Sequence, residues 1–366
     1  MNRRPGCVVA LLLMVPVLAA CSIGDVRRPP PDRTSASPGP VVTASARPPV
    51  ADVHEARLVR VAVPDRYDPP FIEFVDAEQA YALFATCDGR PPGRDCPALL
   101  FATQDGGRSW KPLRHPRSVA EDQQLYAPKG LLVLAAEPFG WYASTDDGVT
   151  FTHYPGVARP PVLVGADGRF QLTQDSGRVA RWDGRRLRPL PAQPDLPTVN
   201  TVREAGDLLV AAGATDGRPY AALSTDQGRT WQRSPVPAPD GEVGVLRVMP
   251  APGGEVWLIG ERPDRTGFPA LWQYRGNWEL VRAAGHPDEM RSAAPVGDGR
   301  VAVTGPDGVG VVVDGRYERV NWPVGPEHYL YLLDDGTLVA RAPDEIVLAV
   351  GPVGARRWIR VALVGD

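Results

Sequence analysis

The chain has 366 residues, of which 43% are hydrophobic and 23% charged, with 38 glycines, 41 prolines and a formal charge of −3. Glycine and proline are both unfavourable inside helices, so this composition argues against a large helical enzyme and favours many short strands joined by tight turns. The near-neutral charge excludes a dedicated nucleic-acid binder, which would carry a strongly basic domain.

The first residues have the pattern of an export signal. Arg3 and Arg4 form a basic start, and an apolar run follows from Val8 to Leu18. About 11 apolar residues are too few to cross a bilayer as a helix, which needs roughly 20. We therefore interpret residues 1–20 as a signal peptide, whose export route the basic pair leaves open.

The four residues that end at Cys21 resemble the lipobox of bacterial lipoproteins. The resemblance implies that the Cys21 thiol is acylated and that Cys21 becomes the first residue after cleavage. The two acyl chains of a diacylglyceryl group suffice for stable anchoring, where a single chain is marginal. We therefore expect a lipid anchor that places the protein on the extracytoplasmic face of the cell membrane.

Residues 21–56 lack the apolar side chains that a folded core needs. Seven prolines and scattered serines and threonines lie between Ser22 and Ala56, with almost no large apolar residue. Such a composition predicts a disordered tether, which spans roughly 30 to 100 Å depending on how extended it is.

Three octapeptides with the pattern [Ser/Thr]-x-Asp-x-Gly-x-[Ser/Thr]-aromatic begin at Thr103, Ser144 and Ser224, at intervals of 41 and 80 residues. Similar intervals separate the apolar residues that follow a turn in each unit, and these are Trp110, Phe151, Leu187, Trp231, Trp278, Tyr317 and Trp358. A recurring period of about forty residues indicates a repeat architecture. Seven units result.

Each unit divides into apolar runs of four to seven residues separated by turn signals, which suit strands and are too short for typical helices. Four strands in a unit of about forty residues, repeated in tandem, describe the blades of a β-propeller. The sequence therefore predicts an all-β, seven-bladed β-propeller over residues 57–366.

The octapeptides resemble Asp-boxes, the BNR repeats of sialidases and sortilin-type receptors. The resemblance implies a turn between the third and fourth strands of a blade, in which the aspartate accepts backbone hydrogen bonds, the glycine has a positive φ and the aromatic residue packs between blades. These structural positions are Asp105, Gly107, Trp110, Asp146, Gly148, Phe151, Asp226, Gly228 and Trp231.

Two classes of function remain. The favoured one is a non-enzymatic binding or scaffold module for a protein or glycan partner, and the alternative is a glycoside hydrolase of the exo-sialidase type. Sialidases need an arginine cluster, a tyrosine nucleophile with a glutamate partner and an acid/base aspartate. Arg60, in Val59–Pro64, is a poor match to their first arginine motif, so we assign no catalytic residue. A hydrolase would require carboxyl groups roughly 5 to 10 Å apart in the central channel.

No metal-ligand spacing or nucleotide-binding loop is present, and the five histidines are isolated from one another, so we expect neither a metal nor another cofactor. Cys87 and Cys96 flank a polar loop between two apolar runs, Tyr81–Ala85 and Ala98–Ala102. Outside the cytoplasm this pair is expected to form a disulfide. We expect a monomer.

The strand order of a blade places the octapeptide turns on one face of the ring, and the second-to-third-strand loops with the connections between blades on the other. Charged and aromatic residues on loops of a rigid scaffold suit a binding surface, although each of them taken singly fits an ordinary solvated loop residue. This candidate binding face comprises Arg90, Arg94, Phe139, Trp141, Asp216, Arg218, Arg262, Asp264, Arg265, His286 and Glu289.

Closure of the ring admits two interpretations. The final unit contains four strand-like segments of its own, yet Arg57–Val63 also has the pattern of a strand. An unpaired apolar strand would expose a ladder of free backbone groups. We therefore predict that Arg57–Val63 pairs at the outer edge of the last blade.

Overall fold

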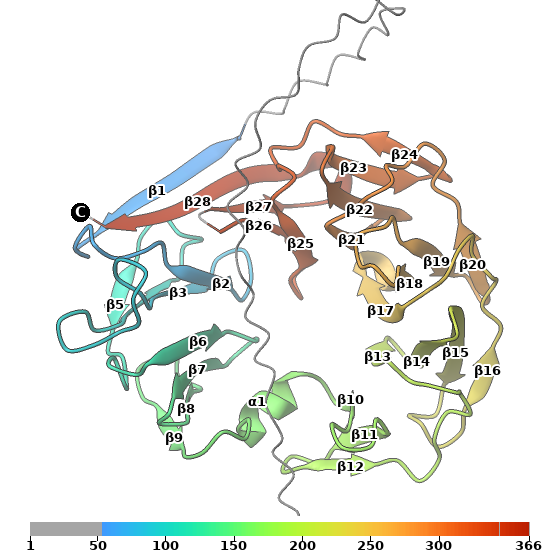
Figure 1. The fold of residues 1–366 in the computed structure, drawn as a ribbon, viewed down its shortest axis with the longest axis horizontal. Coiled ribbons are helices and arrows are strands. Elements are labelled where there is room, and N and C mark those ends of the chain that lie inside the picture. Colours follow the sequence, from blue (N-terminus) through green and yellow to red (C-terminus); the bar gives the residue numbers. More distant parts are fainter. Residues whose placement is uncertain (1–52, 344, 366) are drawn as a thin grey trace, which may run out of the picture. The chain divides into compact units, whose positions relative to one another are not determined.

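The strands of the protein form seven separate sheets that follow one another around a ring (Figure 1). The structure, a computed structural model, describes residues 53–343 and 345–365. Seven sheets around a ring define a seven-bladed β-propeller, which confirms the predicted all-β architecture. The predicted signal peptide, Cys21 and nearly all of the predicted tether lie outside the described residues.

Five blades have four antiparallel strands each, which run from the centre of the ring outward in chain order. Blades 1 and 2 comprise β2 (Phe71–Phe74), β3 (Ala80–Phe84), β4 (Leu99–Thr103) and β5 (Lys111–Leu113), and then β6 (Asp122–Tyr126), β7 (Leu132–Glu137), β8 (Trp141–Ser144) and β9 (Thr152–Tyr154). Blades 4 and 5 comprise β13 (Thr201–Ala205), β14 (Leu208–Thr215), β15 (Arg218–Ser224) and β16 (Gln232–Ser234), and then β17 (Val245–Ala251), β18 (Glu255–Glu261), β19 (Ala270–Tyr274) and β20 (Trp278–Val281). Blade 6 comprises β21 (Ser292–Gly297), β22 (Arg300–Gly305), β23 (Gly308–Val313) and β24 (Arg316–Arg319). Two single-turn 3-10 helices, Pro252–Gly254 and Val353–Ala355, lie in connecting turns.

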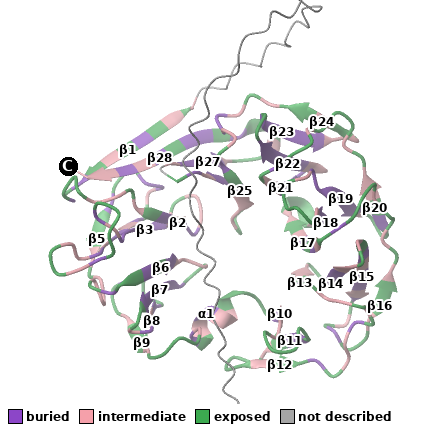
Figure 2. Cartoon of the chain, viewed as in Figure 1, coloured by how far each residue is buried: buried purple, intermediate pink, exposed green. Residues whose placement is uncertain are grey.

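The hydrophobic core lies between the blades. Each blade is a single sheet, so its middle strands bury both faces against neighbouring blades (Figure 2) and are apolar along their length. All five residues of Leu132–Ala136 in β7 are buried, for example. Between blades 4 and 5, Val210 and Ala212 share one cluster with Leu258 and Trp272.

The three octapeptides form the same turn between the third and fourth strands of blades 1, 2 and 4. In blade 4, the Asp226 carboxylate accepts hydrogen bonds from the Thr230 backbone N–H at 2.9 Å and the Thr230 hydroxyl at 2.7 Å. The Ser224 hydroxyl donates to Asp226 and accepts from the Gly228 N–H, each at 2.8 Å. Asp105 and Asp146 make the same type of bond. These carboxylates are therefore engaged in holding the fold.

The ring closes at blade 7, which has five strands: β25 (Tyr329–Leu332), β26 (Leu338–Arg341), β27 (Ile346–Val350), β28 (Arg357–Gly365) and β1 (Glu55–Val61). β1 pairs with β28 in parallel over seven residues, so the predicted pairing at the outer edge of the last blade is confirmed, with the strand shifted two residues toward the N-terminus. The buried Arg57 on β1 also donates to the Gly106 carbonyl of blade 1. The first strand thus joins the last blade to the first.

Blade 3 departs from the predicted four strands. Its sheet contains only β10 (Phe170–Leu172), β11 (Val179–Trp182) and β12 (Leu187–Pro189), and the short helix α1 (Pro161–Ala166) precedes them at the inner end of the blade (Figure 1). Proline cannot donate to a sheet ladder, but it suits the first turn of a helix, where its missing N–H is not needed. Pro160 and Pro161 begin α1 in this way.

The Cys87–Cys96 disulfide is present and closes the loop between β3 and β4, which confirms that prediction. No helix among the described residues is long and apolar enough to cross a membrane.

Candidate functional site

The interface between blades 2 and 3 differs from the other six. Each of the other interfaces has a core cluster with side chains from both neighbouring blades. Here the buried Leu163 of α1 packs on Leu131, Val133 and Ala143 of blade 2, and in the described part of the chain that cluster contains no residue of blade 3. We call this interface the seam.

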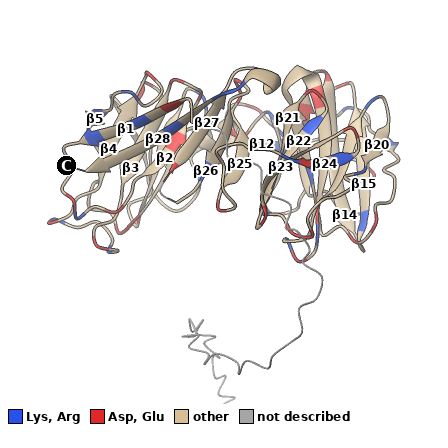
Figure 3. Ribbon diagram, turned by 90° about the horizontal axis from the view of Figure 1, so that it is seen from above, with Lys and Arg blue, Asp and Glu red and all other residues tan. Residues whose placement is uncertain are grey.

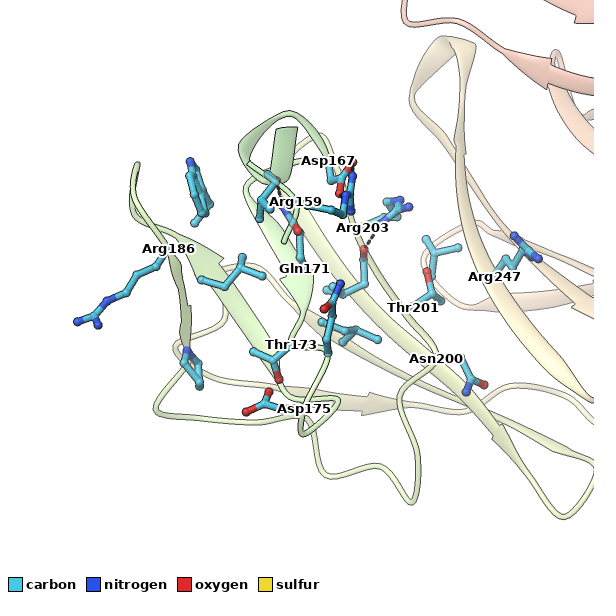
Figure 4. A pocket seen from close by; sticks show the side chains of 18 of the residues that line it. Arg159, Asp167, Gln171, Thr173, Asp175, Arg186, Asn200, Thr201, Arg203 and Arg247 are labelled. Atoms are coloured by element: carbon cyan, nitrogen blue, oxygen red, sulfur yellow. Dashed lines mark hydrogen bonds and ion pairs between the residues drawn. The ribbon is translucent and has the colours of Figure 1, made fainter. Parts of the chain in front are cut away.

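A cavity of about 1690 Å³ lies beside the seam, lined by α1 with the segment before it and by the three strands of blade 3. One face of the blade 3 sheet packs on blade 4, where Phe170 and Val179 meet Val202. From the opposite face, Gln171 and Trp182 line the cavity. The cavity continues to residues 200–203 at the start of β13 and to residues 245–250 of β17 (Figure 4), and it reaches Tyr331 and Leu332 of β25 in blade 7.

The cavity is rich in arginine although the whole chain is nearly neutral. Its lining contains five arginines and two aspartates, and these are Arg159, Arg185, Arg186, Arg203, Arg247, Asp167 and Asp175. Two of the arginines form ion pairs, Arg159 with Asp167 at 2.8 Å and Arg247 with Glu261 at 2.5 Å. The side chains of Arg185, Arg186 and Arg203 have no carboxylate partner among the described residues. The cavity therefore offers positive charge to an anionic ligand.

The two carboxylates of the lining are poorly suited to acid catalysis. Asp167 is held by Arg159, and hydrogen bonding to the Thr173 hydroxyl lowers the pKa of Asp175. A general acid in glycoside hydrolysis needs a raised pKa. In Figure 4 the two aspartates lie at opposite ends of the cavity. Asp167 precedes β10 in the sequence, and Asp175 follows it. The arrangement favours binding over hydrolysis.

The inner edge of β10 has free backbone groups. The Trp182 N–H donates to Arg169 O, and the Thr173 N–H donates to Arg178 O. Gln171 is opposite Ala180 in the same register, so residues 169, 171 and 173 are the ones whose backbone groups face β11. In an antiparallel ladder, only alternate residues direct their N–H and C=O toward the partner strand. Phe170 and Leu172 therefore direct theirs away from β11, toward the inner edge, where no described residue pairs with them.

The candidate binding face predicted from the sequence is distributed over several blades. Its residues lie in the β3–β4, β7–β8, β14–β15 and β18–β19 loops, at the adjoining strand starts and in the connection after β20. Charged residues are present on both faces of the ring (Figure 3). One grouping among them surrounds Phe268, whose ring stacks on His286 at 4.2 Å and whose carbonyl accepts a hydrogen bond from Arg262.

Other members of this face stabilise their own loops. Asp264 accepts the N–H groups of Thr266 and Gly267, and these bonds lower its pKa. The Arg117 guanidinium lies 3.7 Å from the ring centre of Phe139, and the Trp141 indole donates to Val157 O at 3.3 Å. Whether this face binds a partner stays a prediction.

The sequence does not mark the cavity residues, because their arginines are distributed over loops and strands and form no motif. One signal was available. Phe151 and Leu187 are 36 residues apart, whereas the corresponding intervals elsewhere are 39 to 47. A short unit that also contains Pro160-Pro161 indicates a missing strand, and a missing strand indicates an incomplete interface.

One group of side chains in the described residues has the composition of a metal site. Ligand atoms of Glu327, His328 and Glu345 lie within 4.8 Å of one another. However, His328 Nδ1 accepts the Gly325 N–H at 3.0 Å, and Glu345 is paired with Arg360 at 2.8 Å. These contacts use His328 Nδ1 and one oxygen of Glu345, whose other oxygen lies 3.3 Å from His328 Nε2, and together they tie the loop before β25 to blade 7.

Comparison with known proteins finds similar solved structures at low sequence identity. No model of a known protein family and no curated protein matches the chain. Among solved structures, YCF48 bound to D1 peptide is similar over 84% of this chain and 96% of that chain, with a TM-score of 0.42 and 16% identity. AztD from Citrobacter koseri is similar over 80% and 89%, with a TM-score of 0.40 and 11% identity. The Pyrococcus horikoshii acylaminoacyl peptidase is similar over 79% and 52%, with a TM-score of 0.43 and 11% identity. Likeness at this level is confined to the fold.

Proposed function

We propose that this protein is a lipid-anchored extracytoplasmic lipoprotein whose propeller binds an acidic segment of a partner protein in the seam cavity. The lipid anchor is inferred from the resemblance of the residues ending at Cys21 to a lipobox. The type of propeller is inferred from the resemblance of the three octapeptides to the Asp-boxes of BNR propellers. The observation that carries the binding function is the arginine-rich cavity beside the seam, the interface at which the described residues of blades 2 and 3 share no core cluster.

The anchor is tested by Cys21→Ala. The thiol is the acylation site that the lipobox offers, so we expect the variant to lose lipid labelling and to leave the membrane fraction. The matched control is Cys7→Ala, which removes a cysteine from the predicted signal peptide and should leave the membrane fraction unchanged. An unchanged membrane fraction for Cys21→Ala would contradict the anchor.

Binding is tested by placing a photo-crosslinking benzoylphenylalanine at Arg186, on the cavity rim, or at Val149, which is 75% exposed in the blade 2 octapeptide. We expect a polypeptide adduct from position 186 that Arg203→Glu abolishes. Equal adducts from both positions, or adducts insensitive to Arg203→Glu, would count against the cavity.

The two candidate surfaces are compared directly by equal charge changes. The double variant Arg186→Glu/Arg203→Glu alters the cavity, and Arg218→Glu/Arg265→Glu alters the face predicted from the sequence. We expect only the first to weaken crosslinking of the partner, by about tenfold or more, because rim charges steer association and discriminate between partners. The reverse result would move the binding site to the loop face.

Hydrolysis is the second candidate, carried only by the sialidase-like octapeptides. Asp167 is paired with Arg159, and hydrogen bonding lowers the pKa of Asp175, so neither carboxylate suits a general acid and binding is favoured instead. Turnover of a fluorogenic sialoside that disappears in Asp167→Asn would favour the hydrolase.

A further inference from the structure

We propose that the partner segment binds by strand addition, in an extended conformation along the inner edge of β10, where it supplies the strand that blade 3 lacks. This inference rests on the proposed function and specifies how the cavity recognises its ligand.

The backbone of β10 is arranged for such an addition. Phe170 and Leu172 present N–H and C=O groups at the inner edge, and both lie in a strand whose other edge is already paired with β11. An added strand forms main-chain hydrogen bonds at such an edge, and side-chain pockets then select its sequence. With about 3.3 Å per residue, a segment of three to five residues covers β10 and its flanking turns.

Blade 3 differs from its neighbours in having room at this position. In the four-stranded blades the second strand is covered by a first one, as β14 is by β13. In blade 3 the corresponding stretch of chain forms α1, which packs its buried Leu163 on blade 2 and accepts a hydrogen bond at Val164 O from the Gln171 side chain of β10. The cavity is lined by Val164 on the α1 side and by Gln171 and Leu172 on the β10 side.

The charge of the lining selects an acidic occupant. Arg203 on β13 and Arg186 on the rim have no carboxylate partner among the described residues, and carboxylate side chains of an added strand would supply one. The chain's own residues 21–52 fit less well, because they contain four arginines and only three acidic residues. A separate acidic polypeptide is therefore the occupant that the cavity favours.

The first step of the test identifies a probe peptide. Random decapeptides displayed on phage are selected on the full-length chain, and sequences that also bind Arg186→Glu/Arg203→Glu are discarded. We expect acidic peptides to be enriched. If no peptide binds in an arginine-dependent way, both this inference and the proposed function fall.

The second step tests the binding mode with the enriched peptide. Backbone N-methylation at alternate residues should weaken binding about tenfold or more, whereas methylation at the residues between them should have little effect, because only alternate amides face β10. On binding, the amides of Phe170 and Leu172 should exchange with solvent about tenfold more slowly. The Gln171 amide is the internal control, because its residue already pairs with Ala180.

The outcomes separate the two proposals. A peptide that binds through the arginines but tolerates every N-methylation, with unchanged exchange at Phe170 and Leu172, would overturn strand addition and leave the proposed function in place. Deletion of residues 22–50 gives a further comparison. Tighter peptide binding by the truncated chain would identify the chain's own N-terminal segment as a competing occupant and overturn the choice of a separate partner.

Discussion

Gly228 shows how one residue of an octapeptide joins two blades. Its φ is +81°, and a Cβ at this position would collide with Leu190 Cδ1 at the end of blade 3. Gly276 has a similar φ of +86°, but a Cβ there would meet nothing within 4 Å. An alanine substitution at Gly276 therefore tests backbone strain alone, whereas one at Gly228 tests strain together with close packing.

We predict that Gly276→Ala lowers the free energy of unfolding by about 1 kcal/mol through backbone strain alone. Gly228→Ala should lower it by about 2 to 4 kcal/mol, because overpacking adds to the same strain. Urea denaturation of both variants measures the difference. Equal losses would show that the octapeptide glycine has no role in packing between blades.

Asp226 makes stability depend on pH in the acid range. The Thr230 N–H and then the Thr230 hydroxyl bind its ionised carboxylate and lower its pKa to about 2. A carboxyl with a lower pKa in the folded than in the unfolded chain stabilises the fold above roughly pH 4, and this stabilisation is lost as the pH falls toward the folded pKa.

We predict that Asp226→Asn flattens the fall in Tm between about pH 4 and pH 2. Asp240→Asn is the charge-matched control, since Asp240 is exposed and accepts no hydrogen bond from a described residue. Thermal unfolding at closely spaced pH values tests the prediction. Identical pH profiles for the two variants would contradict the role assigned to the turn carboxylate.

At the scale of elements, β1 joins the last blade to the first. It supplies seven paired residues to blade 7, and Val61 is buried in the core that blades 7 and 1 share. Residues 22–50 have the Pro-rich composition of a tether and contain few of the apolar side chains that a strand of the core needs. Their removal should therefore leave the ring intact.

We predict that deleting residues 57–63 lowers the Tm by at least about 5 °C, whereas deleting residues 22–50 changes it little. Val61→Ala keeps the prediction testable if the deletion prevents folding, because it removes two buried methyl groups and should lower the Tm by a smaller amount. Similar Tm values for the two deletions would refute closure by β1.

At the scale of the whole molecule, the seam makes the packing between blades differ from one part of the ring to another. Blade 3 shares a core with blade 4 but not with blade 2, whereas blade 4 has a core cluster on each side. We predict that in mild urea the amides of β11 exchange about tenfold faster than those of β14, because local opening follows the number of buried contacts. Equal protection of the two strands would show that α1 completes the seam.

Periodicity was sufficient to predict seven blades and the octapeptide turns, and the apolar runs that flank Cys87 and Cys96 predicted the disulfide, because each depends on residues close together in the sequence. The two interpretations of ring closure could also be resolved, since an unpaired apolar strand such as Arg57–Val63 is unfavourable. The cavity could not be predicted. Its arginines come from blades 3, 4 and 5 and from the segment around α1, and they converge only because one strand is absent.

The parallel pairing of β1 with β28 has a mechanical consequence. Tension applied through the chain that precedes Glu55 pulls β1 along its own axis, while β28 is held in blade 7 by β27. In this geometry the hydrogen bonds of all seven paired residues resist together, instead of opening one after another from an end. Tension along β1 would thus load its pairing with β28 in shear, the direction in which a parallel edge strand opposes separation with its whole ladder.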